Sequence, residues 1–198
     1  IMIDECGAPE KISGCKLIPI PSSNGKITPE SIQPFLHGFD FEHHSQPKLI
    51  SISQVTELGT VYTVDEIKAI TKLAHEYGLY VHMDGARIAN AAVALNLPFK
   101  AFTADAGIDV LSFGGTKNGM MMGEAVIFFN ENLSQHAKYF RKQSGQLFSK
   151  MRYVAAQFLA YFENDLWKKN ATHSNKMAAL LAQNVALLNV QITQKVQA

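Results

Sequence analysis

The fold is decided by residues 79–87, which read Leu79-Tyr80-Val81-His82-Met83-Asp84-Gly85-Ala86-Arg87. Their apolar residues predict a strand over 79–84, and a helix is expected over 87–95. Outward from this stretch, residues 48–54 alternate as a strand and residues 109–113 predict another. Strands that alternate with helices are typical of βαβ units. The sequence therefore predicts an α/β fold with a mostly parallel sheet and helices on both faces.

Helix and strand signals extend this pattern on both sides. Thr63 with Glu66 three residues later predicts the capping box of a helix that ends at Gly78. Thr28 before Pro29 predicts another helix start. Further strands are expected over residues 15–20 and 124–130. The second of these follows a short turn, which favours an antiparallel return.

The last third of the chain is expected to be helical from residue 133, with a break at 143–145. Residues 170–175 have the polar composition of a linker, and an amphipathic helix is expected over 175–196. This gives a large domain over residues 1–170. The remaining residues, 171–198, would form a linker and a helical extension that leads to a small domain.

The composition indicates a soluble protein with one substantial core, since 47% of the 198 residues are hydrophobic. The formal net charge of +1, with no long run of like charge, argues against a nucleic-acid partner. Cys6 and Cys15 form no metal-binding pattern, so free thiols in the cytoplasm are the simplest expectation. Neither a signal peptide nor a membrane span is expected, and adjacent His43 and His44 lack metal-ligand spacing.

A second motif, Ser112-Phe113-Gly114-Gly115-Thr116-Lys117-Asn118-Gly119, places an amine in a glycine-rich turn at the end of a strand. Ligands in open α/β sheets bind at the carboxyl ends of strands. Asp84 and Arg87 follow another such end. An amine that can bond covalently, a carboxylate for a ring nitrogen and a guanidinium for a substrate carboxylate suit pyridoxal 5'-phosphate (PLP).

Each of these residues also has a structural interpretation. Lys117 could be a solvated turn residue, Asp84 could cap the helix that follows it, and Arg87 could lie on that helix. The two motifs favour a site because both end strands of the same predicted sheet.

The motifs at 82–87 and 112–119 resemble those of the low-specificity L-threonine aldolases, PLP enzymes of fold type I in the aspartate aminotransferase superfamily. The resemblance runs from residue 4 to Arg152. It implies that Lys117 binds PLP covalently, that Asp84 contacts the ring nitrogen and that Arg87 binds the substrate carboxylate. It also implies that Arg152 approaches the phosphate of a neighbouring subunit's cofactor, in a homodimer or homotetramer.

The sequence departs from the family pattern in two respects. Glu57 stands where many members have a histidine that helps with the substrate hydroxyl, so Glu57 and His82 are both candidate bases. The family's N-terminal part and most of its small domain have no counterpart here. We therefore expect this stretch to look like a fragment that is not a competent enzyme by itself.

The resemblance implies a lyase that cleaves threonine or allo-threonine to glycine and an aldehyde by a retro-aldol reaction. The same residues would also serve a β-eliminating lyase, a phenylserine aldolase or a racemase. A nucleotide- or flavin-binding domain and an oligomerisation domain are alternatives of another class, but the chain has neither G-x-G-x-x-G nor the P-loop pattern.

Overall fold

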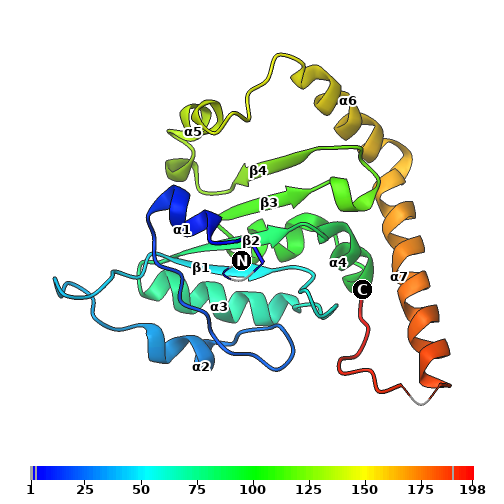
Figure 1. Ribbon diagram of the computed structural model, residues 1–198, viewed down its shortest axis with the longest axis horizontal. Coiled ribbons are helices and arrows are strands. Elements are labelled where there is room, and N and C mark those ends of the chain that lie inside the picture. The colour runs from blue at the N-terminus through cyan, green and yellow to red at the C-terminus, as the bar shows by residue number, and fades with distance from the viewer. Residues whose placement is uncertain (1, 3, 189) are drawn as a thin grey trace.

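A four-stranded sheet forms the centre of the computed structural model, which describes residues 2, 4–188 and 190–198 (Figure 1). Its strands are β1 (Leu49–Ser53), β2 (Tyr80–Gly85), β3 (Val110–Gly114) and β4 (Glu124–Phe128), in the order β1-β2-β3-β4. The first three are parallel and β4 is antiparallel to β3. The predicted mostly parallel sheet is therefore confirmed, with strand ends that differ from those expected by at most two residues.

The crossover helices α3 (Val64–Glu76) and α4 (Ile88–Leu95) join the parallel strands. The predicted capping box is present, because the Thr63 side chain accepts from the Glu66 N–H and the Glu66 carboxylate accepts from the Thr63 N–H. Parallel crossovers are right-handed, so a sequential strand order places both helices on the same face of the sheet. Our expectation of helices on both faces is wrong for this pair.

The two faces of the sheet differ in chemistry. The face toward the helices buries Ile50, Ile52, Val81, Met83, Leu111 and Phe113. Each buried side chain of this size contributes about 1.5–3 kcal/mol, so this face anchors the sheet to the core. The opposite face carries Ser51, Ser53, His82, Asp84 and Ser112, all of them partly or fully exposed. The sheet therefore keeps one polar face.

The C-terminal part is helical, as expected, but its segments differ from the prediction. It contains α5 (Ala137–Gln143), α6 (Met151–Phe162) and α7 (Leu166–Ala186), with the predicted break at residues 143–145 confirmed. The predicted linker at 170–175 lies inside α7. Its polar residues make tertiary contacts there: Asn175 exchanges two hydrogen bonds with Asn90 of α4, at 2.8 and 3.0 Å.

The helix predicted over residues 175–196 is also too long, because α7 ends at Ala186. One residue of that prediction, 189, lies outside the described residues. Residues 190–198 are not helical. They return to the body of the protein, where the Gln197 side chain accepts from the Val61 N–H at 2.8 Å.

The N-terminal segment contains two short helices, α1 (Ala8–Ser13) and α2 (Pro29–Ile32). Thr28 caps α2 as predicted. The strand predicted over residues 15–20 is wrong, because this segment pairs with no strand of the described chain and is mostly exposed. The described residues also contain 3-10 turns at Gln33–Phe35, Phe99–Phe102, Ala104–Ala106, Thr116–Asn118, Glu131–Leu133 and Glu163–Asp165.

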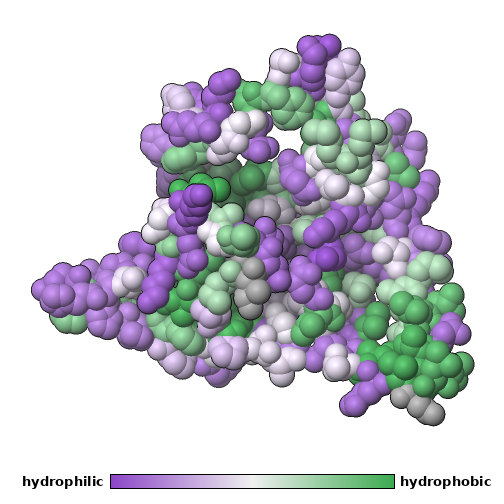
Figure 2. All heavy atoms as spheres, viewed as in Figure 1, coloured by the Kyte–Doolittle hydropathy of each residue, from purple (hydrophilic) through white to green (hydrophobic). Residues whose placement is uncertain are grey.

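The surface has an apolar cluster at the C-terminal end of α7, visible as the green area at the lower right of Figure 2. It contains the exposed side chains of Leu180, Leu181, Leu187, Leu188 and Val190. Within the described part of the chain, no helix combines the length and hydropathy that a membrane span requires. Cys6 and Cys15 are free and exposed.

Candidate active site

The carboxyl ends of the three parallel strands meet at one edge of the sheet, on the side where α4 and α7 lie (Figure 1). Glu57 follows β1, Asp84 and Arg87 come at the end of β2, and Lys117 follows β3. The Arg87 Nη1 group donates a hydrogen bond to Glu57 Oε1 at 3.1 Å. This bond lowers the pKa of Glu57; burial opposes the effect, and the charges of Arg87 and Lys117 add to it. The structure thus brings the predicted residues of three strand ends together.

Glu57 projects from a turn that its neighbours hold in place. The Thr56 N–H donates to the Thr60 carbonyl at 3.0 Å, and the two hydroxyl groups lie 2.6 Å apart. The Gln54 N–H, just before the turn, donates to the Asp84 carbonyl at 2.8 Å. Hydrogen bonds within the turn, and one to the end of β2, therefore fix the backbone that carries Glu57.

Asp84 organises the next turn. Its Oδ1 atom accepts from the Ala86 N–H at 2.9 Å, in the turn that precedes α4. The helix-capping role that we considered for this carboxylate is wrong, because the N-cap of α4 is Arg87 and no side chain caps the helix there. Among the described residues, the other oxygen of Asp84 has no hydrogen-bond partner and remains available to a ligand. A Cβ atom on Gly114 would lie 2.5 Å from Ala86 Cα. Only glycine lets the end of β3 come this close to the Asp84–Arg87 turn.

The Lys117 turn is fixed by the residue that follows the lysine. Asn118 is 6% exposed, and its side-chain amide donates to the Tyr161 hydroxyl at 2.7 Å and to the Trp167 carbonyl at 2.9 Å. The Asn170 amide donates to the Asn118 carbonyl at 2.9 Å. Lys117 itself is exposed. An accessible amine therefore sits on a turn that α6 and α7 hold rigidly.

Sequence reasoning missed Asn118 and its partners. Their sequence signal is weak, because a polar residue in a glycine-rich turn is typical of any exposed loop. Its burial depends on helices that begin more than 30 residues later in the chain.

His82 lies on the polar face of the sheet between two serines. Its Nδ1 atom is 2.9 Å from Ser51 Oγ, and its Nε2 atom is 2.9 Å from Ser112 Oγ. Burial lowers the pKa of His82, although the charge of Asp84 acts in the opposite direction. The ring is therefore a neutral bridge across three strands, with both nitrogens engaged.

Arg152 lies in the first turn of α6, which Figure 1 shows above the sheet, and it does not join this cluster. Its side chain is exposed, and its guanidinium carbon lies 5.1 Å from the centre of the Tyr153 ring.

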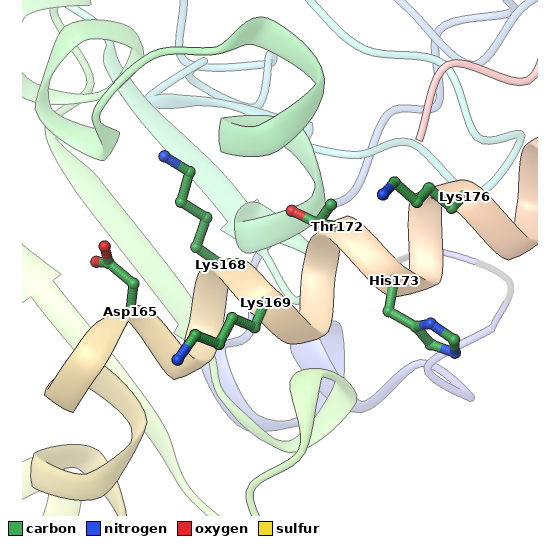
Figure 3. A pocket seen from close by; sticks show the side chains of 6 residues that line it. All are labelled: Asp165, Lys168, Lys169, Thr172, His173 and Lys176. Carbon is green, nitrogen blue, oxygen red and sulfur yellow. The ribbon is translucent and has the colours of Figure 1, made fainter.

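A hollow of about 470 Å³ runs along α7, lined by Asp165, Lys168, Lys169, Thr172, His173 and Lys176 (Figure 3). All six residues belong to one helix and the residue before it. Their side chains point apart in Figure 3 rather than toward a common point. A binding site needs polar groups that converge, so this hollow is not the candidate site.

The residues at the strand ends fit the requirements of PLP better than those of a metal ion. They supply an exposed amine at Lys117, a carboxylate with a free oxygen at Asp84 and a guanidinium at Arg87. The described residues contain no cluster of three or more His, Cys, Asp or Glu side chains able to hold a metal ion.

Comparisons with known proteins find related sequences and structures. The family model described as β-eliminating lyase matches residues 1–198. The chain is 47% identical over 184 residues to the low-specificity L-threonine aldolase of Pseudomonas aeruginosa, covering 92% of this chain and 53% of that protein. It is 32% identical over 175 residues to the aldolase of the same name from Saccharomyces cerevisiae, covering 87% of this chain and 44% of that protein.

Among solved structures, the threonine aldolase of Leishmania major superimposes with a TM-score of 0.88 at 35% identity. The match covers 96% of this chain and 55% of that one. The chain thus spans about half the length of the relatives that it matches.

Proposed function

The chain belongs to the β-eliminating lyase family, and on that premise we propose that the protein is a PLP-dependent lyase that cleaves threonine or allo-threonine to glycine and acetaldehyde. The observation that carries this proposal is the meeting of Asp84, Arg87 and Lys117 at one edge of the sheet. The 47% identity to an L-threonine aldolase supports the choice of reaction.

Three residues would hold the cofactor. Lys117 would bind it covalently, the free oxygen of Asp84 would accept from its ring nitrogen, and Arg152 would reach the phosphate of a neighbouring subunit's cofactor. When bound, PLP supplies the electron sink that carbon–carbon cleavage next to an amino group requires. The negative charge of Asp84 would hold a proton on the ring nitrogen, which is electrostatic stabilisation placed where charge develops.

The remaining residues would act on the substrate. The Arg87 guanidinium matches a carboxylate in geometry and charge, so it would anchor the amino acid. Glu57 and His82 are the two candidates for the base that removes the hydroxyl proton. The position of Glu57 beside Arg87 supports the first candidate. The two serine contacts of His82 support a structural role for that ring.

The test is product analysis with the full-length protein, PLP and L-threonine. We expect equal amounts of glycine and acetaldehyde, and almost complete loss of both in an Asp84→Ala variant that still folds. Pyruvate from serine without acetaldehyde from threonine would instead indicate a β-eliminating lyase. Near-normal cleavage by Asp84→Ala would overturn the role given to this carboxylate.

Three further proposals concern the whole protein. Residues 1–170 would belong to the PLP-binding domain, and residues 171–198 would lead to a small domain. The protein would form a homodimer or homotetramer, because the role of exposed Arg152 requires a neighbouring subunit. The apolar end of α7 supports a covering partner, since large exposed apolar patches usually mark contacts. The free thiols of Cys6 and Cys15 support a cytoplasmic location.

A further inference from the structure

Arg87, the proposed anchor of the substrate carboxylate, already holds a carboxylate from its own chain. Its Nη1 group lies 3.1 Å from Glu57 Oε1. The side chain of Arg87 is 35% exposed and that of Glu57 is 66% exposed. The pair therefore lies at the mouth of the site, where a ligand can reach both members.

Asp84 accepts hydrogen bonds from backbone N–H groups close to both Glu57 and Arg87. The Gln54 N–H, which precedes the Glu57 turn, donates to the Asp84 carbonyl at 2.8 Å. The Ala86 N–H, which precedes Arg87, donates to the Asp84 carboxylate at 2.9 Å. One residue thus fixes the two backbone segments from which Glu57 and Arg87 project. The backbone at both ends of the pair is therefore fixed, while the two side chains stay partly exposed.

We propose that Glu57 occupies the carboxylate position on Arg87 in the free enzyme and that the substrate carboxylate displaces it. The inference rests on the proposed function, because it takes Arg87 as the substrate anchor. A guanidinium can hold a carboxylate through two parallel N–H···O bonds, whereas Glu57 uses one. The substrate therefore offers Arg87 the better geometry, and a partly exposed pair is easily broken.

This competition weakens the binding of every ligand whose carboxylate uses Arg87 by the same factor, because each must first displace Glu57. Displacement also removes the hydrogen bond that does most to lower the pKa of Glu57. The freed carboxylate is a stronger base only when substrate is present.

The first test measures the chemical reactivity of Arg87 in the full-length protein without cofactor. Phenylglyoxal modifies accessible arginines, and peptide mass spectrometry gives the rate at Arg87 itself. We expect the rate to rise about threefold in Glu57→Gln and at least as much in Glu57→Ala, as the loss of a partly exposed ion pair predicts. Glu76→Gln is the matched control, because it removes the carboxylate of a surface pair with Lys72. An Arg87 rate that is the same in wild type and both Glu57 variants would overturn the inference.

The second test measures glycine binding to the PLP-loaded protein by the change in cofactor absorbance. Glycine has the substrate carboxylate but no hydroxyl group, so a role of Glu57 as base does not affect its binding. We expect Glu57→Gln to bind glycine about threefold more tightly, and Glu76→Gln to bind it as wild type does. Equal or weaker binding by Glu57→Gln would contradict displacement. If the full-length protein neither binds PLP nor cleaves threonine, the proposed function fails, while the phenylglyoxal rates still report on the pair.

Discussion

The substitution Gly114→Ala should move Lys117 relative to Asp84 and Arg87, because the structure leaves no room for the added methyl group. A Cβ atom there would lie 2.5 Å from Ala86 Cα, 2.7 Å from its carbonyl oxygen and 2.9 Å from its carbonyl carbon. Carbon atoms in contact prefer about 3.5–4.0 Å, so Gly114→Ala must move the end of β3 by roughly 1 Å relative to the Asp84–Arg87 turn. The obstacle is backbone, which cannot rotate away as a side chain can. We expect a cost of about 1–3 kcal/mol in unfolding free energy.

The effect on activity should be larger than the effect on stability. The move changes the distance between Lys117 and Asp84, and a misplacement of about 1 Å can lower a rate roughly 100-fold. The assay is threonine cleavage by the full-length protein, together with urea unfolding. Gly78→Ala is the control, because Gly78 has a φ of +68° and open space around it. It should lose about 1 kcal/mol through backbone strain alone and keep its activity. A fully active Gly114→Ala variant would refute the reasoning.

Three other predictions concern stability and use unfolding free energies. Asn118→Ala leaves the Tyr161 hydroxyl and the Trp167 carbonyl without a donor, so it should cost about 2–4 kcal/mol, and a loss below about 0.5 kcal/mol would argue against a rigid turn. Because burial lowers the pKa of His82, the unfolded chain takes up a proton near pH 6.5, before the folded chain does. The unfolding free energy should therefore fall as the pH drops below 6.5. It should fall less in a His82→Asn variant. Burial raises the pKa of Tyr62 from 10.0 to about 12, so stability should fall between those pH values, and a Tyr62→Phe variant with the same slope would contradict this.

The strands and the caps were predictable because their signals are local. The apolar alternation of residues 48–54 and the Thr63–Glu66 capping box each lie within one segment, and both are confirmed. The common edge of Asp84, Arg87 and Lys117 followed from parallel pairing, which the structure also has.

The errors arose where contacts between distant segments decide the structure. Residues 170–175 have the composition of a linker, but their asparagines bind Asn90 and the Lys117 turn. Residues 15–20 have the pattern of a strand but no strand beside them. The bond between Glu57 and Arg87 joins residues 30 positions apart and depends on side-chain geometry, which no local pattern encodes.

The most direct test of the account is to locate the lysine that binds the cofactor. The full-length protein would be incubated with PLP and reduced with borohydride, and its peptides would be analysed by mass spectrometry for a trapped pyridoxyl group. We expect the label on Lys117, with the label lost in Lys117→Ala. An intact, folded and PLP-supplied protein that carries no label, or carries it on another lysine, would contradict this expectation.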